Sequence, residues 1–278
     1  MNKGLINRIL PFSSVDGPGN RTAIFLQGCN FNCLYCHNPE TINLCSHCGK
    51  CVSNCPYGAL NLDENKVFWN KNLCDKCDIC LKVCNKSSSP KAVYMTVEQI
   101  IAEIQKTSAF ISGITVSGGE CTLQSEFLIR LFSEVRKMGL TCFIDTNGST
   151  PLSENKALVD VMDMAMVDLK SYDPEEHKFL TGMGNDVVIE NIKYLSKINK
   201  LYEVRTVIVP ELLNNKYNVD MTSKLIASLN PNIKYKFIKY RPMGVRTEII
   251  NSYTPSDEVM EELKIVALEN GCTDVILV

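Results

Sequence analysis

The chain has 278 residues, 45% of them hydrophobic, so it can bury a sizeable core in one large domain or in one domain with a small insert. Its 29 basic and 31 acidic residues give a net charge of −2 without a basic run, which argues against nucleic acid as the main partner. The N-terminal stretch lacks a signal or transit pattern, and no apolar run approaches the roughly 20 residues of a membrane span, so we expect a soluble cytoplasmic protein without a membrane partner.

The first predicted element is an apolar strand at 22–27, which runs into Cys29. After residue 90, short runs rich in β-branched residues alternate with amphipathic stretches. The further expected strands are 113–117, 141–146, 165–169, 203–209, 235–240 and a short last strand at 275–278, and the expected helices are 97–106, 125–138, 155–162, 187–198, 219–229 and 257–269. This alternation indicates βαβ units and a parallel sheet. Six units are too few for a closed eight-stranded barrel, so we expect an α/β fold, a partial (β/α)6 barrel with its site at the carboxyl ends of the strands.

Fourteen cysteines are present, and eleven of them fall in tight runs between Cys29 and Cys84. Tight spacing brings thiolates together on one turn, which suits metal sites better than a disulfide framework. The other three are expected to be small buried side chains: Cys121, Cys142 and Cys272. Residues 45–90 are cysteine-rich and poor in helical pattern, so we expect them to form an inserted domain, with 1–44 and 91–278 forming the barrel.

The first cysteine run directly follows the first strand and has the spacing C-x3-C-x2-C, with Cys29, Cys33 and Cys36. Three thiolates are one fewer than a [4Fe–4S] cluster normally has. One iron would then be open to a small molecule, to which it could pass an electron. The alternative is a zinc site with His37 as a fourth ligand, for which this spacing is poor.

The next two runs have the spacing of bacterial two-cluster ferredoxins, in which the fourth cysteine of each run ligates the other cluster. By that rule one cluster takes Cys45, Cys48, Cys51 and Cys84, and the other takes Cys74, Cys77, Cys80 and Cys55. The second run lacks the usual proline, because Asn85 follows Cys84. Two structural zinc sites are the alternative. Fully ligated clusters bind no substrate, so we expect both to carry electrons.

The three-cysteine loop, with the aromatic Tyr35 before its last cysteine, resembles the radical S-adenosylmethionine superfamily. The segments PFSSVDGPGNR and CHNPE on either side of the loop, and a two-cluster insert behind them, resemble the glycyl radical enzyme activases. The combination of VDGPG, FLQGC and GITVSGGE is most similar to the YjjW-like subgroup. The resemblance covers nearly the whole chain.

This resemblance implies three [4Fe–4S] clusters and S-adenosylmethionine as a consumed co-substrate. The cluster held by Cys29, Cys33 and Cys36 would cleave the co-substrate reductively to a 5′-deoxyadenosyl radical. That radical removes a hydrogen from a glycine of a partner, the glycyl radical enzyme. A flavodoxin or ferredoxin would donate the electron, and a monomer that meets its partner transiently is expected.

The glycine-rich segment after the second strand of the parallel sheet is the next candidate. Gly118 and Gly119 let the backbone approach a ligand closely, and Glu120 matches the family segment that holds the methionine amino group. A tight turn with a solvated glutamate is the alternative. By resemblance, Tyr35 also binds the co-substrate.

Three charged residues end the next two strands. Asp168 and Lys170 are two apart on a strand, so they share a face, and Lys170 can pair with the carboxylate of the co-substrate. By resemblance, Asp145 and Asp168 bind ribose hydroxyls or a monovalent cation. Ordinary helix capping is the alternative for Asp145.

Two arginines complete the predicted site. Arg205 lies inside an apolar strand and needs a partner: the family's arginine there faces the co-substrate, whereas an ion pair with Glu203 is the alternative. Arg241 stands where relatives commonly carry a histidine, and arginine can stack on adenine and bind ribose. The stretch around His177 is expected to form only a surface helix and turn.

Two other functions remain open at this point. A radical enzyme of the same superfamily could act on another peptide, a nucleoside or a small metabolite. A pure electron carrier or zinc scaffold would not need the long strand–helix alternation or the incomplete three-cysteine site.

Overall fold

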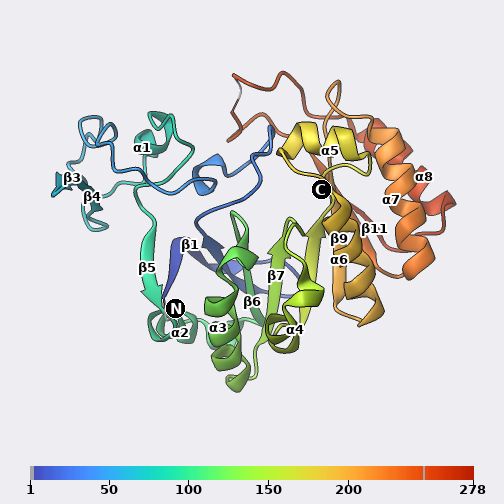
Figure 1. Ribbon diagram of the computed structural model, residues 1–278, viewed down its shortest axis with the longest axis horizontal. Helices are drawn as coiled ribbons and strands as arrows, with labels where there is room; N and C mark the ends of the chain where they lie inside the picture. The colour runs from blue at the N-terminus through green and yellow to red at the C-terminus, as the bar shows by residue number, and fades with distance from the viewer. Residues whose placement is uncertain (1–2, 247) are drawn as a thin grey trace.

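The computed structural model describes residues 3–246 and 248–278, and within them it forms a nine-stranded sheet and a separate two-stranded hairpin (Figure 1). The strand order in the large sheet is β11-β10-β9-β8-β7-β6-β2-β1-β5. Strands β2 and β6 to β11 run parallel to one another, and β1 pairs antiparallel with both β2 and β5. The predicted α/β fold with a parallel sheet is therefore confirmed.

Every strand predicted for the parallel sheet is present. Their bounds are β2 Arg21–Leu26, β6 Gly113–Gly118, β7 Thr141–Thr146, β8 Met164–Asp168, β9 Leu201–Ile208, β10 Lys234–Lys239 and β11 Val275–Leu277. The helices that cross between them are α2 Val97–Gln105, α3 Ser125–Lys137, α4 Lys156–Val161, α6 Asp186–Lys197, α7 Asn215–Leu229 and α8 Asp257–Glu269. All six residues of β2 are buried, which is typical of a parallel strand covered on both faces.

Two strands of the large sheet were not predicted. β1 (Lys3–Ser13) and β5 (Val93–Thr96) extend the sheet beyond β2, and register shifts interrupt the β1–β2 pairing. The expected helix and turn at His177 are present as α5 (Pro174–Thr181), which ends at Gly182. Its outer side is exposed, as expected of a surface helix, but His177 itself is fully buried, because the inner side of α5 lies over the carboxyl end of the sheet and packs against the loop of the first cysteines (Figure 1).

Residues 45–90 lie to one side of the large sheet (Figure 1). They contain the hairpin of β3 (Leu60–Asp63) and β4 (Lys66–Trp69) and the short helix α1 (Ile79–Lys82). Their buried side chains form a small apolar cluster of their own, made of Cys51, Leu60, Val67 and Cys80. A second core lies between the sheet and its helices. No helix in the described part of the chain is both long and apolar enough to span a bilayer.

Candidate active site

One cavity opens where the parallel strands end, and segments from six strands meet around it. Its wall is built from the first cysteine loop and from polar residues that follow β6, β7 and β8. The lining residues are Cys29, Phe31, Cys33, Tyr35, Cys36, His37, Asn38, Thr41, Ile42, Ser117, Gly118, Gly119, Asp145, Thr146, Asn147, Asp168, Lys170, Arg205, Val207 and Ile238. Most residues predicted for the site therefore share this cavity, and Glu120 and Arg241 do not line it.

The backbone of the cysteine loop is held by distant parts of the chain. The amides of Asn32 and Leu34 donate to carbonyls of α5, each at 2.9 Å. Nη2 of Arg246 donates to the Cys33 carbonyl at 2.7 Å. Because these bonds fix the backbone from outside the loop, the three cysteine side chains stay turned to the cavity.

The chemistry of the three thiols fits a cationic cluster. Burial raises the pKa of Cys29 to about 11 and that of Cys33 to about 12, so the free thiols hold their protons at neutral pH. Iron bound to sulfur stabilises the thiolate and reverses this preference. The Tyr35 hydroxyl is buried in the same wall and has no hydrogen-bond partner among the described residues, which leaves a polar atom available to a bound group.

Gly118 and Gly119 have a packing role. A Cβ on Gly118 would lie 2.3 Å from the backbone of Leu26, and Gly118 has a φ of +114°. A Cβ on Gly119 would lie 2.1 Å from the carbonyl oxygen of Gly28. The missing side chains therefore let the end of β6 pass against the start of the cysteine loop, where the Glu120 amide donates to the Gly28 carbonyl at 2.8 Å.

Glu120 is completely buried and acts inside the protein. Its Oε1 accepts from the amide and hydroxyl of Thr122 at 3.0 and 2.6 Å and from the Thr146 hydroxyl at 2.8 Å. Its Oε2 accepts from the Asn147 amide at 2.7 Å. The carboxylate thus fixes the turn after β7, and the structure does not bring it to the cavity surface as the glycine-rich segment predicted.

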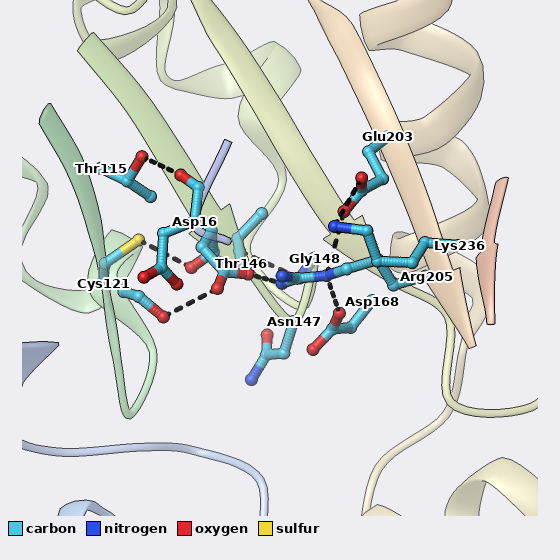
Figure 2. Close-up of polar contacts among 12 residues, drawn as sticks. Asp16, Thr115, Cys121, Thr146, Asn147, Gly148, Asp168, Glu203, Arg205 and Lys236 are labelled. Atoms are coloured by element: carbon cyan, nitrogen blue, oxygen red, sulfur yellow. Dashed lines mark hydrogen bonds and ion pairs between the residues drawn. The ribbon is translucent and has the colours of Figure 1, made fainter. Parts of the chain in front are cut away.

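Four charged side chains of the cavity wall are linked by ion pairs, and Figure 2 shows the contact between Arg205 and Asp168. The Arg205 guanidinium pairs with Asp145 through one arm, and its Nε donates to Asp168 Oδ1 at 2.7 Å. Lys170 donates to Asp168 Oδ2 at 2.7 Å. Burial lowers the pKa of Arg205 to about 10, so it remains charged at neutral pH. The predicted ion pair of Arg205 with Glu203 is only a 3.9 Å contact.

Arg241 lies apart from these four charged side chains. It is exposed and lines a second, larger hollow between residues 14–17 and strands β10 and β11. His37 connects the two regions, because it lines both and its Nε2 lies 3.2 Å from the Arg241 carbonyl oxygen.

The cysteines of residues 45–90 surround two smaller cavities. One is lined by Cys45, Cys48, Cys51 and Cys84 together with Cys80. The other is lined by Cys55, Cys74, Cys77 and Cys80. Among the described residues, no set of three or more His, Cys, Asp or Glu side chains is close enough to hold a single metal ion. In each cavity the fourth cysteine comes from the other run.

Several lining residues were missed from the sequence. The Asn147 side chain donates to Cys29 Sγ at 3.8 Å, and the Ser117 hydroxyl donates to Asp145 Oδ2 at 2.8 Å. Ser117 ends the predicted strand 113–117 and Asn147 follows the one at 141–146, so their position was the available signal. Val207 and Ile238 add an apolar wall from β9 and β10, and nothing in their residue types marks them.

A family model of the radical SAM superfamily matches residues 23–216. The chain belongs to the radical SAM superfamily. The matched region spans the first cysteine loop and β2 to β9, which build most of the cavity wall.

Relatives of nearly full length place it more closely. The chain is 30% identical to the pyruvate formate-lyase-activating enzyme of Streptococcus mutans, over 87% of this chain and 79% of the relative. It is 29% identical to the indoleacetate decarboxylase activating enzyme of Tractidigestivibacter scatoligenes, over 97% of this chain and 96% of the relative. This radical SAM protein is thus a glycyl radical enzyme activating enzyme.

The fold also agrees with that of solved structures. QueE from Escherichia coli superposes with a TM-score of 0.52 over 99% of this chain and 93% of its own, at 14% sequence identity. At this identity the likeness concerns the fold alone.

Proposed function

We propose that this radical SAM enzyme activates its partner by taking a hydrogen from a glycine α-carbon of that protein. The observation that supports this most is the cavity itself, in which three thiols face two carboxylates, a lysine and an arginine. A cluster on Cys29, Cys33 and Cys36, with S-adenosylmethionine bound to it, would supply the electron and the 5′-deoxyadenosyl radical. We infer that the parallel sheet curves into a partial (β/α)6 barrel around this cavity.

The chain's own residues would orient the co-substrate. Lys170, held by Asp168, would present its ammonium to the methionine carboxylate. Asp145 and Asp168 would accept hydrogen bonds from ribose hydroxyls or hold a monovalent cation. The buried Tyr35 hydroxyl would donate to the bound molecule, and Val207 with Ile238 would exclude water from one side.

We propose that residues 45–90 form a ferredoxin-like insert with two further [4Fe–4S] clusters. The support is the pairing of distant cysteines around each cavity, which follows the crossed ligation of two-cluster ferredoxins. The cavity of Cys45 and Cys84 would be nearer the active site, because Asn43 bridges to Ser88 and the Cys29 amide donates to Ile42 at 2.8 Å. These clusters would relay electrons from a flavodoxin or ferredoxin.

The partner we propose is a glycyl radical enzyme, met transiently by a monomer in the cytoplasm. The segment around Asp16, Gly17 and Arg21 would border the entry of the partner's glycine loop, since residues 14–17 line the second hollow. The motifs VDGPG, FLQGC and GITVSGGE favour the YjjW-like subgroup.

Anaerobic electron paramagnetic resonance tests this function. The reconstituted protein is mixed with reductant, S-adenosylmethionine and a candidate glycyl radical protein. We expect a glycyl doublet on the partner, with 5′-deoxyadenosine formed in step, and neither with Cys33→Ala. Cleavage without a doublet for any glycyl radical protein would contradict the activase function, and no cleavage by an iron-loaded protein would contradict the radical chemistry.

A further inference from the structure

Arg205 stands between two hollows of the protein. One is the cysteine-loop cavity, and the other is the second hollow beside residues 14–17. Three of the described residues line both: Arg205, His37 and Ile238. Of these, Arg205 alone carries a permanent charge, so its position affects the electrostatics of both spaces.

In the present arrangement, Arg205 occupies the carboxylates that the proposed function assigns to the co-substrate. Asp145 pairs with Arg205 through Oδ1 and accepts from Ser117 through Oδ2. Asp168 accepts from Arg205 through Oδ1 and from Lys170 through Oδ2. Each of these four oxygens already has a partner, so a ligand hydroxyl or cation would compete with the guanidinium.

Glu203 offers the guanidinium another acceptor. It lies two residues before Arg205 on β9, so both side chains share a face (Figure 2). Its exposure is only 1%, and its Oε2 pairs with Lys236 at 2.8 Å. Its Oε1 is buried without a hydrogen-bond partner among the described residues and lies 3.9 Å from Arg205 Nε. A buried carboxylate oxygen in this state is unfavourable, so the pocket favours a donor that reaches it.

We propose that Glu203 is a positioning residue that receives the Arg205 guanidinium when S-adenosylmethionine binds. This inference rests on the proposed function of the cysteine-loop cavity. A movement of about 1 Å converts the present contact into a hydrogen bond of ordinary length. The same movement frees oxygens of Asp145 and Asp168 and changes the wall of the second hollow. Binding in one hollow therefore changes the affinity for a ligand in the other.

Equilibrium dialysis with labelled S-adenosylmethionine tests this on anaerobic, iron-loaded protein. Glu203→Gln keeps the size of the side chain and removes its charge, and we expect the Kd to rise about tenfold. Glu262→Gln, at an exposed glutamate, is the matched control and should leave the Kd unchanged. Thermal melting of each variant shows whether it is folded.

A double-mutant cycle separates this role from a structural one. In an Arg205→Met background, Glu203→Gln should no longer change the Kd, because the residue acts through the guanidinium. An equal factor in both backgrounds would overturn the proposal, and so would a native Kd for Glu203→Gln. If Glu203→Gln does not fold, Glu203→Asp is used in its place. It keeps the charge but moves the carboxylate oxygen away from Arg205, so the Kd should rise by less than the tenfold expected for Glu203→Gln.

A crystal structure of the native holoenzyme with S-adenosylmethionine provides the direct test. We expect Arg205 within about 3.2 Å of Glu203 Oε1. An arginine still held between Asp145 and Asp168 would refute the proposal. A failure of the proposed function would give another result: the native protein itself would then neither bind nor cleave S-adenosylmethionine.

Discussion

The change Glu120→Gln distinguishes a buried structural carboxylate from a ligand to the co-substrate. The carboxylate accepts four hydrogen bonds from three residues. A glutamine amide can keep the three at Oε1, but its NH2 group then faces the Asn147 amide, which loses its acceptor. A buried unpaired donor costs about 1–3 kcal/mol, and the remaining bonds lose their charge assistance. The sum is about 2–4 kcal/mol of unfolding free energy, reduced somewhat by the easier burial of a neutral group.

For a chain of this size, such a loss corresponds to a fall in Tm of roughly 5–10 °C. Differential scanning fluorimetry under anaerobic conditions measures it, with Glu262→Gln as the exposed control. S-adenosylmethionine should not be needed for the difference to appear. A variant that melts with the native protein but binds S-adenosylmethionine tenfold more weakly would refute this reasoning and support a direct contact.

Three further predictions concern the cysteine loop, the crossed ligation and pH. Cys29→Ala should abolish cleavage of S-adenosylmethionine, measured as 5′-deoxyadenosine, because the remaining two thiols cannot hold the cluster; retained cleavage would contradict the site. With the three clusters that we propose, Cys84→Ala should lower bound iron by about a third and alter the spectrum of the cluster assigned to Cys45. A change in the cluster assigned to Cys74 instead would contradict the crossed arrangement. Burial lowers the pKa of His177 below its ordinary value of 6.5, so between the two pKa values the imidazole is protonated in the unfolded chain but neutral in the native protein. The free energy of unfolding should therefore be highest above pH 6.5 and fall as the pH is lowered below it. His177→Phe should flatten this fall in denaturant titrations, and an unchanged slope would count against it.

Much of the fold could be predicted because its strands are continuous apolar runs. β7 and α8 have the predicted bounds, and each parallel strand starts and ends within two residues of its prediction. β1 was missed because Pro11 and exposed residues interrupt its alternation. The helix at His177 was predicted and is α5, which Asp173 caps before Pro174 and Gly182 ends in a left-handed conformation. The burial of His177 was missed, because so short a helix has too little periodicity to mark its buried side.

The site was predictable where spacing or strand ends decide it. The positions of Asp145, Asp168 and Lys170 in the cavity follow from the rule that parallel strands end at one edge. Arg205 lies inside β9, and its signal was a charge within an apolar strand. The burial of the Glu120 side chain could not be predicted from its position at a strand end. It depends on hydrogen-bond donors from Thr146 and Asn147, which belong to another strand and the turn after it. The place of Arg241 outside the cavity likewise depends on how the segment after β10 leaves the sheet.

The way the cysteine loop is held has a consequence for biosynthesis. The three cysteines that we propose as cluster ligands lie within eight residues, but the backbone of their loop is fixed by α5 and by Arg246, which follows Cys33 by 213 positions. A growing chain that has just left the ribosome therefore presents Cys29 to Cys36 long before the segments that fix their backbone have been made, whereas the two cavities lined by the cysteines of residues 45–90 are built from residues 45–91 alone. With the proposed clusters, iron delivery to the loop of Cys29 to Cys36 should thus wait for nearly complete synthesis, while the two proposed sites in residues 45–90 can be loaded earlier.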